Sequence, residues 1–162
     1  MQPGVSLRDL TASLAERTRS YLAGEMSIDT LAFQDAGADD LAAMLGEHTV
    51  IFGVAGSYGL LALFSFCDEL GDRLVQGAGG HDGSHDGGRH AILARAATVI
   101  LGRWLAEIGT SGALTLSPPV ILKGAQTMHL QDQTICTGAS LVTDAGSLDI
   151  RLMGRAEPVL PR

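Results

Sequence analysis

The stretch TVIFGVAGSYGLLALFSFC, residues 49–67, decides the fold. It is uncharged and long enough to cross a bilayer as a helix, so a membrane span has to be weighed against a pair of strands. Glycines at positions 53, 56 and 59 interrupt it, and Gly-Ser-Tyr-Gly at 56–59 is typical of a turn between two β-rich halves. We therefore predict a β-hairpin over residues 49–66 and no insertion into a membrane.

Further strands are predicted in the last third of the chain. Runs of β-forming residues alternate there with turn signals at Gly124, 132–133 and 144–146. The predicted strands are Val120–Lys123, Thr127–Gln131, Thr134–Val142 and Leu148–Met153. Short strands with tight connections imply an antiparallel sheet, one face of which helices would cover. The predicted fold class is therefore α+β, in a single domain over residues 1–162.

Three stretches predict helices. Ser6 and Asp9 form a capping-box pattern at the start of Leu7–Ala23, where apolar residues recur at helical spacing until Gly24 offers a stop. Asp68–Val75 predicts a short helix. Ala91–Ile108 gives the strongest helix signal, with Gly109 just past its end.

Two segments between these elements are harder to assign. Ile28–Phe33 fits an edge strand, and Asp39–Leu45 fits a short helix. Residues 77–90, GAGGHDGSHDGGRH, are so rich in Gly and Asp that we predict a flexible loop.

The predicted loop also contains residue types that bind zinc or nickel, namely His81, Asp82, His85, Asp86 and His90. A metal site needs fixed geometry and supporting hydrogen bonds, which a glycine-rich loop does not supply. We therefore expect neither a metal nor another cofactor. His48 is expected at a strand edge or on the surface.

Charge and cysteine content narrow the possible partners. The formal net charge is −7, and ten Arg and one Lys are scattered along the chain, which argues against nucleic acid and anionic membranes. Cys67 and Cys136 lie far apart in hydrophobic runs without metal-binding or secretory signals. We expect reduced core thiols in a cytoplasmic protein.

The predicted helix 91–108 has two unequal faces. Apolar residues form one arc, whereas Ala91, Arg95, Thr98 and Gly102 recur at helical spacing as a stripe of small or polar groups. Near the end of this helix, Arg103 and Glu107 are placed to form a local ion pair, and the alternative is that Arg103 makes a buried interface contact.

The order of these elements resembles the CheX branch of the CheC, CheX and FliY chemotaxis phosphatases. The resemblance rests on SLAERTRSYLAG (13–24), TVIFGVAGSYGLLALFSF (49–66), the helix ending at Gly102, LSPPVILKG (116–124) and the final strand pair. It implies an antiparallel sheet with two long, pseudo-equivalent helices on one face, plus short helices. It also implies that the long helix would present a Glu-x-x-Asn pair, preceded by Asp or Ser, to the receiver domain of a phosphorylated response regulator. In that family, Glu pairs with a receiver lysine and Asn orients the attacking water.

The catalytic residues of the family are missing from the corresponding positions. With Gly102 as the anchor, Ala91 replaces the Asp or Ser, Arg95 replaces the Glu and Thr98 replaces the Asn. With Pro118-Pro119 as the anchor, the Glu and Asn positions become Ala94 and Ala97. In either register no carboxylate or amide side chain is available, and the sequence contains no asparagine.

The first helix offers a second candidate position at Glu16-Arg17-Thr18-Arg19. Glu16 keeps a carboxylate, but Arg19 stands where the resemblance places the water-orienting amide. An arginine carries donors only, so it binds an anion but accepts no proton from water.

Three hypotheses follow. The favoured one is a degenerate CheX-like module that binds a receiver domain or another signalling protein through Glu16, Arg19, Arg95 and Thr98, without efficient phosphatase chemistry. The second is an active aspartyl-phosphate phosphatase that uses a shifted constellation such as Glu16 with Thr98 or a loop residue. The third is a structural or assembly protein unrelated to chemotaxis. A homodimer is also plausible, because the last strands carry little charge to protect an exposed sheet edge.

Overall fold

The computed structural model describes residues 6–36, 42–56, 59–77, 86–108, 115–124, 126–129 and 134–155. Its helices are α1 (Leu7–Glu25), α2 (Asp68–Gly77) and α3 (Asp86–Ile108). Its strands are β1 (Thr30–Ala36), β2 (Ala42–Leu45), β3 (His48–Ala55), β4 (Leu60–Phe66), β5 (Thr115–Leu116), β6 (Val120–Lys123), β7 (Gln126–His129), β8 (Thr134–Thr143) and β9 (Gly146–Arg155).

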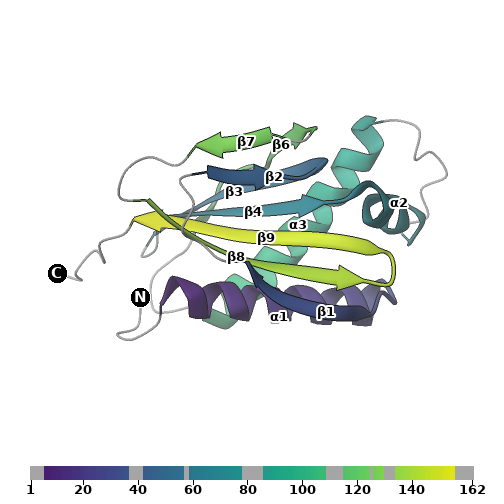
Figure 1. The fold of residues 1–162 in the computed structure, drawn as a ribbon, viewed down its shortest axis with the longest axis horizontal. Helices are drawn as coiled ribbons and strands as arrows, with labels where there is room; N and C mark the ends of the chain where they lie inside the picture. The colour runs from purple at the N-terminus through teal and green to yellow at the C-terminus, as the bar shows by residue number, and fades with distance from the viewer. Residues whose placement is uncertain are drawn as a thin grey trace.

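The main sheet is antiparallel and has the order β1-β8-β9-β4-β3-β5, with β6 also pairing with β3 (Figure 1). The predicted hairpin is confirmed, because β3 and β4 pair from His48↔Phe66 to Val54↔Leu60. Gly56 adopts a φ of 123° after β3, a conformation that glycine takes without steric cost. A separate two-stranded sheet joins β2 to β7.

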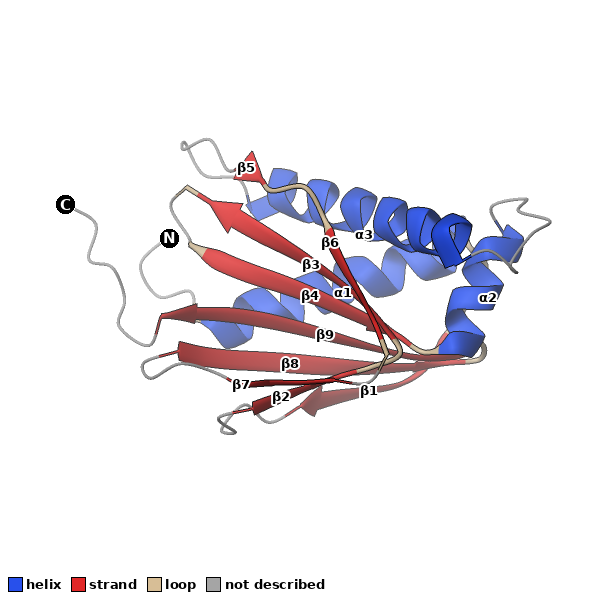
Figure 2. Cartoon of the chain, turned by 90° about the horizontal axis from the view of Figure 1, so that it is seen from above, coloured by secondary structure: helices blue, strands red, loops and turns tan. Residues whose placement is uncertain are grey.

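Helices cover one face of this sheet, which confirms the predicted α+β class (Figure 2). Alternate strand residues that include Phe52, Phe64, Leu141 and Ile150 share one core cluster with helix residues such as Trp104. No helix in the described part of the chain is long and apolar enough to span a bilayer.

Helix α1 begins as predicted and ends later than predicted. The Ser6 hydroxyl accepts the Asp9 backbone N–H at 3.1 Å, and the Asp9 carboxylate accepts the Ser6 N–H at 3.2 Å, which completes the capping box. The expected stop at Gly24 was wrong, because the helix continues through Glu25. Ser27, with a φ of 54°, turns the chain toward β1 instead.

The structure corrects two local predictions. Ala42–Leu45, predicted as part of a helix, is strand β2, because pairing with β7 outweighs the helix propensity of this Ala-, Met- and Leu-rich segment. Residues 86–90, predicted as part of a flexible loop, form the first turns of α3. Contacts of Arg89 and His90 with neighbouring elements compensate there for the low helix propensity of glycine.

The sheet edges also differ from expectation. Strands β8 and β9, whose low charge suggested an exposed edge, lie inside the sheet, with β8 between β1 and β9. The edge strand predicted at Ile28–Phe33 is confirmed as β1, which begins two residues later. Its Leu31 and Phe33 side chains are 69% and 44% exposed.

Candidate functional site

The outward stripe of α3 is open to solvent. Ala91, Arg95, Thr98 and Gly102 are all exposed, whereas Ile100 and Trp104 on the same helix are buried against the sheet. In the alternative register, Ala97 is fully buried and Ala94 is half-buried. Only the register anchored at Gly102 therefore places its residues where a partner protein can contact them.

The chemistry of this stripe is limited. The Thr98 hydroxyl donates a hydrogen bond to the Ala94 carbonyl at 2.7 Å, so it is engaged with its own helix. Arg95 makes no ion pair within the described residues. Because residues 87–106 contain no carboxylate or amide side chain, the stripe itself has no group that would orient a water for attack on a phosphoryl group.

On α1, the Glu16 carboxylate is held by Arg19 one turn further along. Its Oε2 atom accepts Arg19 Nη2 at 2.7 Å and Arg19 Nε at 3.0 Å. Both side chains are half or more exposed, at 60% and 50%, so this pair contributes little to stability. Arg19 does, however, engage the Glu16 carboxylate, which stands at the family's glutamate position on α1.

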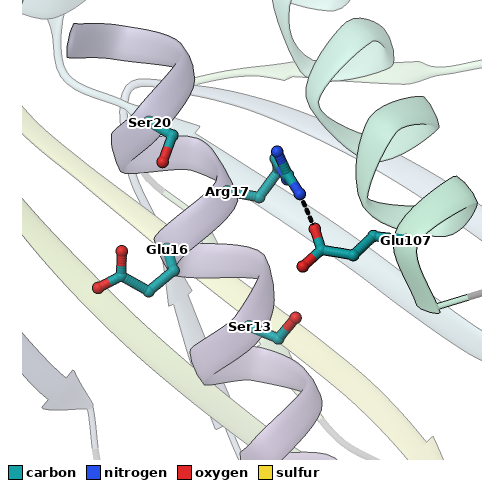
Figure 3. Close-up of a pocket in the computed structure, with 5 residues that line it drawn as sticks. All are labelled: Ser13, Glu16, Arg17, Ser20 and Glu107. Atoms are coloured by element: carbon teal, nitrogen blue, oxygen red, sulfur yellow. Dashed lines mark hydrogen bonds and ion pairs between the residues drawn. The ribbon is translucent and has the colours of Figure 1, made fainter. Parts of the chain in front are cut away.

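A shallow hollow lies between α1 and α3, lined by Ser13, Glu16, Arg17, Ser20 and Glu107 (Figure 3). Arg17 reaches across it from α1 and forms an ion pair with Glu107 of α3. The predicted local pair between Arg103 and Glu107 is therefore wrong. Each of these two residues reaches α1 instead, because the facing helix supplies an opposite charge at close range.

The second inter-helix pair joins Arg103 to Glu25. The Arg103 guanidinium also lies over the Tyr21 ring, 5.7 Å from its centroid. Burial raises the pKa of the Tyr21 phenol, the nearby Glu25 carboxylate raises it further, and the positive charges of Arg103 and Arg95 oppose the shift. Tyr21 is thus a neutral, packed element of the helix pair.

The four predicted protein-binding residues lie on two helices of one layer. Glu16 and Arg19 contact each other on α1, while Arg95 and Thr98 lie one turn apart on α3. No hydrogen bond or ion pair of the described residues joins the first two to the last two. Any site that used all four residues would therefore be completed by a partner spanning both helices.

Sequence reasoning missed a cluster of polar residues at the start of α3. His48 is 3% exposed rather than at the surface, and its Nε2 atom lies 2.5 Å from Asp68 Oδ1. Arg89 extends from α3 to both Asp68 and Asp72 of α2. Asp68 and Asp72 are spaced one turn apart, which was the available signal that this face of α2 meets a basic partner.

Of the residues whose types could bind a metal, the structure describes some and leaves others out. His90 stacks edge-on against His48, with ring centroids 5.6 Å apart. His81, Asp82 and His85 lie outside the described residues, as does the turn predicted at 132–133. Within the described ranges, no group of three or more His, Cys, Asp or Glu side chains is arranged to hold a metal ion.

The fold is that of known chemotaxis proteins. The structure matches CheX from Desulfovibrio desulfuricans with a TM-score of 0.74 at 15% identity, covering 89% of this chain and 97% of that one. It matches a protein of Desulfovibrio vulgaris Hildenborough, assigned to chemotaxis by its description, with a TM-score of 0.71 at 18% identity, covering 91% and 98%. It also matches the Borrelia burgdorferi structure of a CheX-CheY-BeF3-Mg complex, with a TM-score of 0.63 at 14% identity and coverage of 93% and 99%.

Comparison by sequence finds no relative, since no family model and no curated protein matches the chain. At these identities the structural matches establish the fold, which is CheX/CheC-like, and confirm the resemblance seen in the order of the elements.

Proposed function

We propose that this chain is a cytoplasmic CheX-like signalling module that binds the receiver domain of a response regulator through its α1–α3 face. The proposal rests on the fold shared with CheX and on the exposure of the α3 stripe. The solved CheX-CheY complex of Borrelia burgdorferi provides a precedent for a protein of this fold that binds a response regulator.

Loss of the catalytic groups supports binding without efficient phosphatase chemistry. Positioned hydrolysis of an aspartyl phosphate requires a group that aligns water with the phosphorus atom. Arg95 and Thr98 stand at the two key positions of α3, and Glu16 on α1 is paired with Arg19. Binding without efficient catalysis is supported above all by the exposure of Ala91, Arg95 and Thr98 on a stripe without carboxylate or amide groups.

The test uses the receiver domains encoded in the same genome, each purified and measured with and without beryllofluoride and Mg²⁺. Calorimetry should show that the chain binds at least one beryllofluoride-loaded receiver. The same receiver, phosphorylated with acetyl phosphate, should release phosphate at its own rate when the chain is added. The CheX and CheY pair of Borrelia burgdorferi serves as the control for complex formation.

Two results would contradict this proposal. Phosphate release well above autodephosphorylation would show that the chain is an active phosphatase. Failure of every receiver to bind would remove the signalling role and favour a structural or assembly protein.

A homodimer through strand β1 is part of the same proposal. β1 lies at one end of the main sheet, so one side of its backbone has no strand partner among the described elements. The exposed apolar side chains Leu31 and Phe33 accompany this edge. Pairing with a second copy would extend the sheet and place the side chains of the second strand beside Leu31 and Phe33.

A further inference from the structure

Several described charges of the two long helices are paired within the molecule. On the α1–α3 face, Glu16 pairs with Arg19, Arg17 with Glu107, and Arg103 with Glu25. At the start of α3, Arg89 is held by Asp68 and Asp72 of α2. On α1 and α3, Arg17, Arg19, Arg89 and Arg103 are therefore all engaged with carboxylates.

Arg95 of α3 differs from these four arginines. It lies midway along α3, its side chain is exposed, and no ion pair or hydrogen bond in the described part of the chain engages its guanidinium. The Tyr21 phenol is close enough for the charge of Arg95 to affect its pKa, but that phenol is neutral at physiological pH and does not balance the charge. Among the described side chains of this face, Arg95 consequently presents an uncompensated positive charge midway along α3.

The surroundings of Arg95 allow a protein surface to approach closely. Its neighbours on the stripe are Ala91, Thr98 and Gly102, none of which is larger than threonine. A Cβ atom built on Gly102 would meet no atom outside its own stretch of helix within 4 Å, so packing inside the molecule does not require a glycine there. A partner lying on this stripe would bring its own side chains to the guanidinium with little steric hindrance.

We infer that the partner docked on the α1–α3 face carries a surface carboxylate opposite Arg95. This inference rests on the proposed function and specifies the chemistry of the partner. Contact with a lysine, as the family resemblance implies for the glutamate position, would place two positive charges together and weaken the complex. A carboxylate would complete on this helix the same kind of ion pair that the other arginines already make, with the planar guanidinium able to bind both oxygens.

Four variants measured against the receiver panel described above test this inference. Arg95→Glu reverses the charge, Arg95→Gln removes it and Arg95→Lys keeps it. Arg73→Glu, at an exposed position on α2 that makes no ion pair within the described residues, produces the same change in net charge away from the face. Because Arg95 makes no internal contact of this kind, all three of its variants should unfold at the wild-type temperature.

The expected affinities follow from a contact between opposite charges. Arg95→Glu should weaken the receiver that binds wild type by at least about tenfold, and Arg95→Gln by an intermediate factor, as is usual for a charge lost from a desolvated pair. Arg95→Lys should bind more weakly than wild type but more tightly than Arg95→Gln, because lysine keeps the charge without the paired donors of the guanidinium. Arg73→Glu should bind nearly as wild type does. Replacing the receiver's contacting Asp or Glu with Lys should restore binding to Arg95→Glu.

The outcomes distinguish this inference from the proposed function. If a receiver binds wild type and Arg95→Glu equally well, or binds the variant more tightly, the opposing group is not a carboxylate and only the inference falls. If no receiver binds wild type or any variant, the proposed function and the inference fall together.

Discussion

The indole Nε1 of Trp104, on α3, donates a hydrogen bond to Ser13 Oγ, on α1, over 3.1 Å. Trp104 is fully buried, so this bond satisfies the polar atom of the largest side chain in the core and fixes how the two long helices meet.

Ser13→Ala should lower the free energy of unfolding by about 1–2 kcal/mol, because it leaves the buried indole N–H without an acceptor. Ser20→Ala is the matched control, since Ser20 lies on the same helix and borders the same hollow but is exposed. Both variants replace a serine of α1 with alanine, so any gain from helix propensity is the same in the two. Equal unfolding midpoints in urea for the two variants would show that the bond contributes nothing.

Gly102→Ala should raise the free energy of unfolding by about 0.5–1 kcal/mol, because alanine has a higher helix propensity and its methyl group meets no neighbouring atom. Gly146→Ala should have the opposite effect. Its Cβ would lie 2.5 Å from Cys67 Sγ, and its φ of 125° disfavours any side chain. Thermal unfolding of both variants tests this contrast, and a destabilised Gly102→Ala would mean that the stripe is packed in a way that the structure does not show.

Asp68→Ala should destabilise the fold more than Glu69→Ala, by about 1–3 kcal/mol, because it removes a hydrogen-bonding partner from the buried His48 ring. Both acids lie in the first turn of α2, so the loss of favourable charge at the helix N-terminus is similar for the two variants. Urea titrations supply the comparison. The polar cluster would have no structural role if the two free energies agreed.

Tyr21 should make the protein lose stability in alkaline solution. Its folded pKa is raised above the ordinary value of 10.0, chiefly by burial. The stabilising contribution is therefore complete below the unfolded value of 10.0 and is lost as pH rises through the folded pKa, where the unfolded state has already released its proton. Tyr21→Phe should show a shallower loss at high pH. Ultraviolet titration of tyrosinate in wild type and in Tyr21→Phe distinguishes Tyr21 from Tyr58, the second tyrosine of the chain. An ordinary pKa for Tyr21 would refute the expectation.

Leu31→Lys should convert a homodimer into a monomer, because it places a charge on the β1 edge where a second copy would pair. Val120 is 56% exposed and lies on β6, which pairs with β3 away from the β1 edge. Val120→Lys should therefore leave the dimer intact. Light scattering of wild type and both variants gives the mass directly. A monomeric wild type would exclude this dimer.

Local pattern was sufficient for much of the architecture. The glycine-interrupted stretch at 49–66 specified a hairpin, because its turn residues and β-forming halves act over short distances along the chain. The capping box at Ser6 and Asp9 specified the start of α1 for the same reason. The absence of asparagine, and of any acid or amide between residues 87 and 106, also followed from the sequence alone and limits the chemistry available on α3.

Only the tertiary structure decided features that depend on distant partners. The pairing with β7 made 42–45 a strand, and contacts with α2 and His48 accompanied the extension of α3 back to Asp86. Arg103 and Glu107, four residues apart, each pair with an opposite charge on α1, whereas Arg95 has no ion-pair partner among the described residues. Spacing along a helix shows which charges could meet, but the helix packed beside it determines which of them do, because ion pairing falls off with distance in space rather than in sequence.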